Sequence, residues 1–141
     1  MSNQDYKTLE LPAGYKPKIS EPYMCPEQKA YFFQLLGQQR QDLMEEEDEL
    51  KSLAVNLNRA SPTGDALDNA DTDIESKLAI RTASRLNNLL KRYDDAIKRL
   101  ETGAYGYSKI SGDEIGIKRL MARPIAELTI AEQEAKEKNE K

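Results

Sequence analysis

Histidine and tryptophan are missing from this chain of 141 residues, and cysteine occurs once, at Cys25. A single cysteine excludes a disulfide within the chain, and the lack of histidine excludes an ordinary Cys/His zinc site. Catalysis by histidine is excluded for the same reason, and no other nucleophile, base and orienting group stand at a recognisable spacing. We therefore expect a protein that is not an enzyme.

Long apolar runs and an excess of basic residues are missing too. No run approaches the ~20 apolar residues that span a bilayer, and the polar start of the chain lacks the apolar core of a signal peptide. The formal net charge is -4, whereas DNA-binding proteins concentrate basic residues on one surface. The sequence therefore predicts a cytoplasmic protein with no membrane partner and no direct DNA partner.

Leucines at intervals of seven are the clearest pattern in the first half of the chain. They fall between Pro26 and about Asn58, and they predict one long helix with a coiled-coil seam. The second seam column is half polar, because Arg40 and Glu47 interrupt it, so this helix needs a partner. The leucine column is Leu36, Leu43, Leu50 and Leu57, and the second column is Phe33, Arg40, Glu47 and Ala54.

A second long helix is predicted after a Pro and Gly break at residues 62–64. Asp65, Asp68 and Thr72 are each able to cap its start, and Thr72 begins a capping-box sequence. Gly103 is well placed to end it. Its predicted seam columns are Ala79, Leu86, Tyr93 and Leu100, and Thr82, Leu89 and Ala96.

These patterns divide the chain into three parts. Residues 1–25 contain three prolines among scattered aromatics and predict an extended arm that packs on the rest. Residues 26–102 are predicted to form the hairpin, with its tip at 59–72. Residues 103–141 predict a small β-hairpin or knuckle and then a terminal helix that Thr129 begins. We therefore expect a mainly α fold, in which a long antiparallel coiled-coil hairpin stands on a small globular platform.

Two motifs stand in order along the chain. The first, Asp65-Ala66-Leu67-Asp68-Asn69-Ala70, lies between the two predicted helices and has the form Asp-x-x-Asp-x-Ala. The second runs from Gly106-Tyr107 through residues 115–120 to Ala122-Arg123-Pro124. Together they resemble the DksA/TraR family of bacterial RNA polymerase regulators, over the chain from about residue 20 to its end.

The resemblance implies a transcription regulator. Members of this family enter the secondary channel of RNA polymerase, do not bind DNA, and modulate initiation in the stringent response. Carried over to this sequence, Asp65, Asp68 and Ala70 are the tip residues that act near the polymerase active site.

The resemblance also implies cooperation with the alarmone ppGpp, which lies at the junction of factor and polymerase and needs basic groups for its phosphates. The matching positions are Arg92 and Arg123. A third family position, a lysine near the start of the last helix, falls on Gln133, which lacks the charge. Arg85 and Arg92 also lie seven apart, followed by Arg99, and predict a contact stripe for polymerase.

Four positions depart from the family pattern. Many members hold a zinc ion there with four cysteines, two in the knuckle and two at the start of the last helix. Hydroxyls are poor zinc ligands and one carboxylate cannot complete a tetrahedral site, so we expect no structural metal or other structural cofactor. Local hydrogen bonds and a capping box are expected instead. The four positions are Ser108, Ser111, Thr129 and Glu132, and the apolar residues available for a small core are Ile110, Ile115, Ile117, Leu120 and Tyr15 or Tyr23.

Two other functions stay open from the sequence. A Gre-type transcript cleavage factor also presents an acidic coiled-coil tip in the same channel, although that class carries its coiled coil before a separate globular domain. A structural coiled-coil adaptor would dimerise through its heptads. The polar positions of the first seam and the matching seam on the second helix favour closure within one chain, so we expect a monomer.

Overall fold

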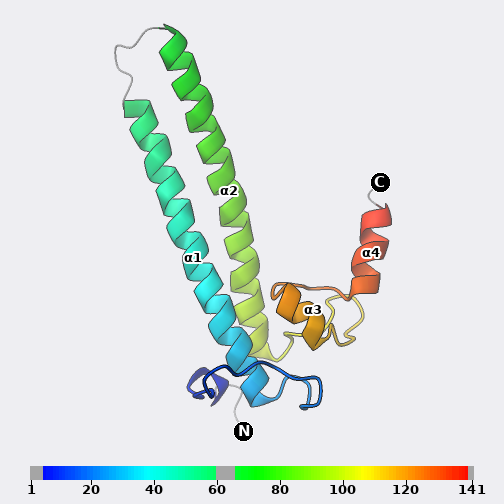
Figure 1. The fold of residues 1–141 in the computed structure, drawn as a ribbon. Helices are drawn as coiled ribbons and strands as arrows, with labels where there is room; N and C mark the ends of the chain where they lie inside the picture. The colour runs from blue at the N-terminus through cyan, green and yellow to red at the C-terminus, as the bar shows by residue number, and fades with distance from the viewer. Residues whose placement is uncertain (1–4, 60–65, 140–141) are drawn as a thin grey trace. The chain divides into compact units, whose positions relative to one another are not determined.

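The computed structural model describes the backbone of residues 5–59 and 66–139, and the side chains of residues 6–56 and 73–139. These residues are mainly helical (Figure 1), and their only β pairing is an isolated antiparallel bridge between Tyr107 and Glu114. The expected mainly α fold with a long helical hairpin is confirmed. Its elements are η1 (Asp5–Lys7), α1 (Pro26–Arg59), α2 (Ala66–Thr102), α3 (Ile117–Ala122) and α4 (Ile130–Asn139).

The chain divides into two compact units. We term Gln39–Arg92 the hairpin unit, which contains most of α1 and α2. We term Met1–Gln38 with Tyr93–Lys141 the platform unit, which contains the start of α1, the end of α2, α3 and α4. The three-part division of the chain at residues 25 and 102 stays a prediction. Over the described ranges 5–59 and 66–139, every helix is too short or too polar to cross a membrane.

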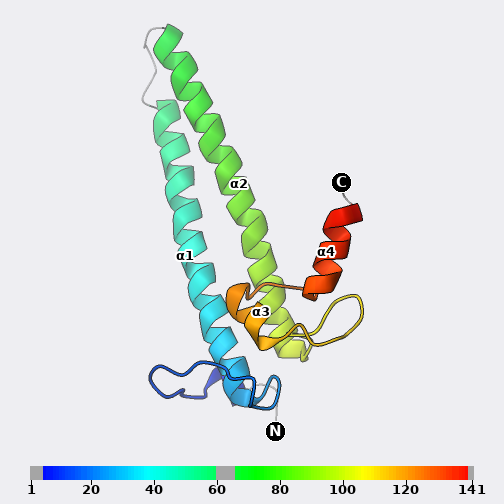
Figure 2. The same ribbon diagram turned by 45° about the vertical axis from the view of Figure 1, so that its right-hand side comes forward.

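Small side chains bring the two helices of the hairpin unit together. α1 and α2 lie side by side in both ribbon views (Figure 1, Figure 2), and Ala54, Ala79 and Ala83 are among the residues buried along them. Ser76 is 2% exposed, and its hydroxyl donates to the Ala54 carbonyl at 3.4 Å. Because the distance between packed helices depends on the side chains at the contact, residues this small permit a close approach.

One column of the α2 seam is displaced from its predicted place over part of its length. The column of Ala79 and Leu86 is buried or half-buried, as expected. Over its first part the companion column falls one residue later than predicted, and there the small Ala83 is buried in place of the bulkier Thr82. Ser76, Ala83 and Leu90 are buried there, whereas the predicted Thr82 and Leu89 are only half-buried. The last residue of the predicted column, Ala96, is 0% exposed, as expected.

The second helix of the hairpin begins directly after Asp65, the first of the three predicted capping residues. α1 continues to Arg59 and α2 already begins at Ala66, so Thr72 lies inside a helix and does not begin one. Gly64 is the last strong helix breaker before α2, and no glycine or proline follows until Gly103. Residues 60–65 of the predicted tip lie outside the described residues.

A buried amide fastens the arm to the start of α1. The helix begins at Pro26, whose fixed φ and missing N–H suit the first helical position. Gln28 is 0% exposed, and its Oε1 accepts a hydrogen bond from the Met24 N–H at 2.8 Å. Its Nε2 donates to the Lys18 carbonyl at 3.0 Å. One side chain therefore closes the helix start and holds the preceding loop.

The core of the platform unit is centred on two aromatic rings. The centroids of Phe32 and Tyr105 are 5.6 Å apart, and the Tyr105 hydroxyl donates to the Pro124 carbonyl at 2.7 Å. Gly103, with φ of 84°, ends α2 as predicted and turns the chain so that the Tyr105 N–H reaches the Arg99 carbonyl at 3.1 Å. The largest fully buried side chains are Tyr105, Phe32, Leu36, Leu100, Leu120 and Gln28.

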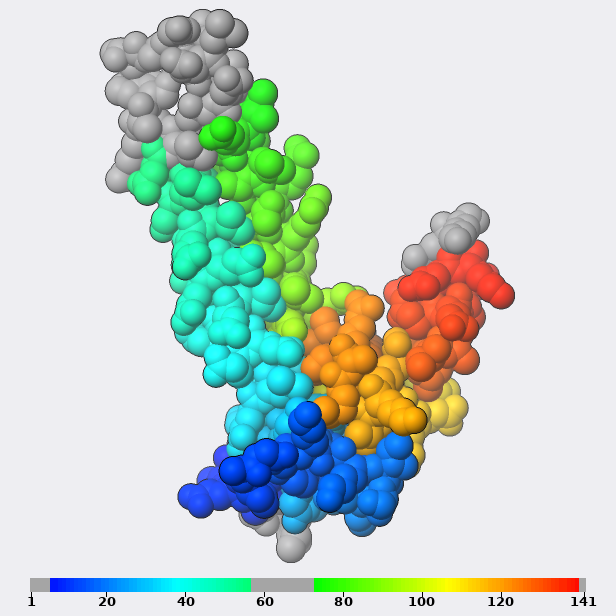
Figure 3. All heavy atoms as spheres, in the orientation of Figure 1, coloured from blue at the N-terminus to red at the C-terminus, as the bar shows by residue number. Residues whose placement is uncertain are grey.

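The arm packs over this core and against α3, as the space-filling view shows (Figure 3). Tyr6 is 3% exposed and meets Phe33 edge to face, with 5.6 Å between the ring centroids. The Tyr23 hydroxyl donates to the Gly106 carbonyl at 2.6 Å and accepts from the Gly116 N–H at 3.0 Å. A Cβ on Gly106 would lie 3.0 Å from that hydroxyl, so this close approach requires glycine.

The segment after Gly103 forms a knuckle with very little β structure. Residues 117–122 form the short helix α3, which was not predicted, because six residues are too few to show a helical period. Ile115, Ile117 and Leu120 are buried as expected. Ile110 was expected in the core and is 73% exposed, because it lies in the tight turn that Ser108 closes.

The buried carboxylate of Glu47 gives a prediction for the hairpin unit. Glu47 is 7% exposed, its Oε1 pairs with Lys51 Nζ at 2.8 Å, and its Oε2 has no hydrogen-bond partner among the described residues. Glu47→Leu removes a buried charge and leaves behind only an exposed lysine, so we expect the free energy of unfolding to rise by about 1 kcal/mol. Denaturant unfolding measures the change. Glu46→Leu, at an exposed neighbouring position, is the control, and a loss of stability in Glu47→Leu alone would contradict this account.

Candidate functional site

The acidic tip motif falls at the start of α2. Asp65 lies outside the described residues. Asp68 and Ala70 lie near the first turn of α2, which begins at Ala66, and their side chains are outside the described part of the chain. The helix dipole favours a carboxylate at this end by about 0.3–1 kcal/mol, so the backbone position suits Asp68. The assignment of these three residues as the acting tip stays a prediction.

The hairpin unit carries two of the predicted contact arginines. Arg85 and Arg92 are exposed, and their spacing of seven places them on one face of α2. An exposed guanidinium offers a planar set of donors to a phosphate or a carboxylate. The position of both side chains is therefore compatible with a partner that carries such groups.

Arg99 has the same spacing but a different environment, inside the platform unit. Its side chain is 14% exposed and lies 3.9 Å from Glu127, measured from the guanidinium to the carboxylate. Its guanidinium nitrogens have no hydrogen bond within the described part of the chain. Glu127 also pairs with Lys109 Nζ at 3.3 Å, and its carbonyl accepts the Lys109 N–H at 2.9 Å. Arg99 therefore belongs to the packing of the platform unit and not to an exposed stripe.

The other two positions that the family resemblance relates to ppGpp lie in the platform unit. Arg123 follows α3 directly and is exposed. Gln133 stands on α4, where its Nε2 donates to Glu137 Oε1 at 3.1 Å. The position for which the resemblance implies a lysine is thus a neutral amide that already bonds to a carboxylate. Arg92 belongs to the other unit, and a shared site with Arg123 stays a prediction.

Hydrogen bonds connect the four positions that the family resemblance relates to zinc ligands. Ser108 Oγ accepts from the Ile110 N–H at 3.1 Å and from the Ser111 N–H at 3.3 Å. Thr129 and Glu132 form the predicted capping box, with the Thr129 N–H to Glu132 Oε1 at 3.0 Å and the Glu132 N–H to Thr129 Oγ1 at 3.2 Å. The hydrogen bond from Ser108 to the Glu132 carboxylate, with further ones from Thr129 and Ser111, lowers the pKa of this carboxyl below its ordinary 4.5. The four side chains therefore form one network, centred on Glu132.

These four side chains do not fit the ligand set of a zinc ion. Three of the four groups are neutral hydroxyls that take part in the turn and the cap, and the fourth is a single carboxylate. Within residues 5–59 and 66–139, no three His, Cys, Asp or Glu side chains gather where they could hold a metal ion. The sequence predicted the capping box but not the bond from Ser108 to Glu132, which joins residues far apart in the chain.

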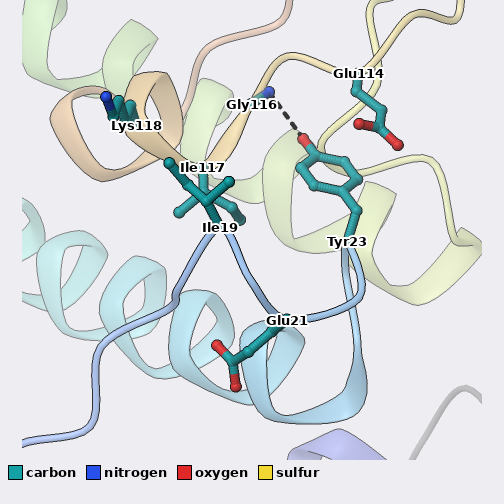
Figure 4. Close-up of a pocket in the computed structure, with 7 residues that line it drawn as sticks. All are labelled: Ile19, Glu21, Tyr23, Glu114, Gly116, Ile117 and Lys118. Carbon is teal, nitrogen blue, oxygen red and sulfur yellow. Dashed lines mark hydrogen bonds between the residues drawn. The ribbon is translucent and has the colours of Figure 1, made fainter.

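A cavity of about 290 Å³ lies between the arm and α3 in the platform unit (Figure 4). Its lining includes Ile19, Glu21 and Tyr23 from the arm and Ile117 and Lys118 from α3. The Glu21 carboxylate already accepts from the Lys18 N–H at 2.8 Å and from the Tyr15 hydroxyl at 2.9 Å, which lowers its pKa. The Tyr23 hydroxyl is held by Gly106 and Gly116. The polar groups of Glu21 and Tyr23 therefore hold the arm in place, and the cavity is the space left between the arm and α3.

These observations define a class of protein, a helical hairpin with an acidic motif at its turn and exposed arginines on its second helix, whose globular part does not fit a metal. Comparison with known families agrees. The family model for the DnaK suppressor protein DksA, N-terminal domain, matches residues 28–100, which is more than half of the chain. The chain belongs to the DksA family.

Individual relatives match most of the chain. The RNA polymerase-binding transcription factor DksA of Caulobacter vibrioides is 34% identical over 130 residues, which are 92% of this chain and 89% of the relative. The protein of the same name from Haemophilus influenzae is 35% identical over 133 residues, covering 92% and 90%. The solved structure of transcription factor DksA2 from Pseudomonas aeruginosa superposes with a TM-score of 0.77 at 34% identity, over 84% of this chain and 89% of that one.

The lowered pKa of Glu132 predicts a pH dependence. A carboxyl whose pKa is lower in the folded state stabilises the fold above its unfolded pKa, and this contribution is lost as the pH falls through the folded value. We expect Glu132→Gln to lower the melting temperature at neutral pH, and the difference from the wild type to disappear as the pH falls well below 4.5. Thermal unfolding across this range measures it. Glu134→Gln, at an exposed position of α4, is the control, and a difference that does not change with pH would rule out this role.

The network also predicts what four cysteines would do. Because the four side chains already meet, replacing Ser108, Ser111, Thr129 and Glu132 together by cysteine should create a tetrahedral site that binds about one zinc ion per chain. Elemental analysis measures bound zinc, and the double variant Ser108→Cys with Ser111→Cys is the control with too few ligands. The wild type should carry no zinc and should melt at the same temperature in chelator. Stoichiometric zinc in the wild type would contradict the proposed network.

Proposed function

We propose that this chain is a transcription regulator that binds RNA polymerase and modulates initiation. Membership of the DksA family supports this, because the relatives from three genera are named RNA polymerase-binding transcription factor DksA. These names describe transcription factors, and they confirm the expectation of a protein that is not an enzyme. The coverage of about nine-tenths of the Caulobacter relative, 89%, supports transfer of the function as a whole.

The finer proposal is that the hairpin enters the secondary channel of polymerase and acts there through Asp65, Asp68 and Ala70. The observation that carries it is the motif Asp-x-x-Asp-x-Ala at the turn of a helical hairpin that the family model spans from residue 28 to 100. Carboxylates near a catalytic magnesium ion change the local charge without any need for chemistry of their own. We therefore assign the regulatory effect to the tip and the binding affinity to the rest of the hairpin.

A role for ppGpp is part of the proposal, with fewer basic groups than the family pattern provides. Arg92 and Arg123 are exposed and suit phosphate groups. Gln133 supplies no positive charge and bonds to Glu137. We propose that the alarmone binds at the interface with polymerase and enhances regulation less than it does in a relative with the lysine. The factor acts as a cytoplasmic monomer that does not bind DNA directly.

The network of hydroxyls and one carboxylate should let the proposed factor work under conditions that damage a zinc site. A site of four cysteine thiolates loses zinc to chelators and is attacked by oxidants. The residues Ser108, Ser111, Thr129 and Glu132 are open to neither reaction. We propose that this factor keeps regulating when zinc is scarce or oxidants are present.

Asp68 gives the central test of the proposed function. We expect the wild type to change transcription from a ribosomal RNA promoter in vitro, with and without ppGpp. Asp68→Asn should lose most of this regulation and keep its affinity for polymerase, because the change removes a charge at the tip and leaves the rest of the hairpin intact. Multi-round transcription and competition binding measure the two quantities separately.

Asp73→Asn is the matched control, since Asp73 is an exposed acid on the same helix that pairs only weakly with Lys77, at 3.2 Å. It should regulate like the wild type. If Asp68→Asn also regulates like the wild type, the tip assignment is wrong. A third measurement uses a backtracked polymerase. Shortening of its RNA by this protein would favour a Gre-type cleavage factor.

A further inference from the structure

An apolar groove lies between the two helices of the hairpin unit. It has a volume of about 320 Å³ and is lined by Leu50 and Leu53 of α1 and by Leu78, Ala79 and Thr82 of α2, with Glu75 beside them. Leu53 is 49% exposed and Leu78 is 59% exposed, so two leucines face solvent at one hollow. Their exposure places both outside the buried seam of the helix pair, which includes Ala54, Ala83 and Leu90.

Single exposed apolar residues are common on protein surfaces and need no explanation. The hairpin unit has such residues in Val55 and Ile80, which are 47% and 51% exposed and are not part of this groove. The groove differs because residues from both helices converge on one concave place. A concave apolar site with a polar edge is the form that receives an apolar side chain of a partner.

The groove is continuous with the face that carries the contact arginines. Leu78, Arg85 and Arg92 lie at successive intervals of seven on α2 and therefore share one face of the helix. The acidic motif that ends at Ala70 precedes Leu78 by about two turns of the same helix. Along α2 the chain thus presents an acidic motif, an apolar groove and a basic stripe in that order.

The size of the groove indicates its occupant. A stable dimer of this chain would bury about 800 Å² on each partner, far more than six residues around one hollow can provide. The groove has room for one or two apolar side chains. We propose that it receives an apolar side chain of RNA polymerase and so anchors the hairpin. This inference rests on the proposed function and adds to it a contact that salt does not weaken.

The test replaces the two exposed leucines by glutamine, which keeps a high helix propensity. Leu53→Gln with Leu78→Gln should weaken binding to RNA polymerase by about tenfold or more, the usual scale for removing an apolar anchor. Val55→Gln with Ile80→Gln is the matched control on the same two helices and should bind like the wild type. The affinities are compared at low and high salt. The loss in the groove variant should be the same at both, whereas the loss in Arg85→Ala should shrink as salt screens the charge.

A photo-crosslinking amino acid gives a second measurement that reports proximity to polymerase and does not depend on a loss of affinity. Placed at position 53 it should crosslink to polymerase, and placed at position 55 it should not. Circular dichroism and thermal unfolding establish that each variant is folded.

The outcomes separate this inference from the function on which it rests. If the wild type does not bind polymerase, the proposed function fails. If the wild type binds and the groove variant binds equally well, without a crosslink from position 53, the groove inference is overturned while the proposed function stands. If the wild type is a dimer in sedimentation and the groove variant is a monomer, the occupant is a second copy, which also overturns the inference.

Discussion

The close approach of α1 and α2 through small side chains is the constraint on which the hairpin unit depends. Ala54, Ser76, Ala79 and Ala83 occupy little width, so the two backbones come together and the Ser76 hydroxyl reaches the opposite helix. A seam this narrow buries little apolar surface per residue and leaves Leu78 at 59% exposure. The interaction that stabilises the hairpin therefore also determines which side chains its surface offers to a partner.

The platform unit has to be stable without the zinc ion that the family resemblance implies for this part of the fold. A structural zinc supplies about 10–16 kcal/mol in small zinc-finger peptides, whereas one hydrogen bond contributes a net ~0.5–1.5 kcal/mol. The network around Glu132 is thus too weak to replace a metal by itself. Burial of one large apolar side chain contributes about 1.5–3 kcal/mol. Phe32, Tyr105 and Leu120, at 0%, 2% and 0% exposure, provide that kind of contribution. The network sets the geometry of the knuckle, and the core supplies the stability.

The features that the sequence could predict depend on interactions between residues close together in the chain. Heptads, Gly103 and the capping box of Thr129 act within a few residues, so the hairpin, the end of α2 and the start of α4 were predicted correctly. The sequence left the start of α2 open among Asp65, Asp68 and Thr72, because local rules do not rank competing capping residues, and the helix begins directly after the first of them. The contacts of Glu132 with Ser108 and of Arg99 with Glu127 join distant parts of the chain, and no local pattern in the sequence marks them.

If the chain acts as proposed, the neutral Gln133 changes how much of the affinity for RNA polymerase comes from charged contacts and how much from apolar ones. Contacts between exposed charges are screened beyond about 8 Å at physiological ionic strength, and here one of the expected cations is replaced by Gln133, which bonds to Glu137. An apolar anchor is not screened and depends only on the exclusion of water. A factor with one cation fewer for ppGpp therefore relies more on its own hairpin to stay bound. Its regulation should follow its own concentration more closely than that of the alarmone.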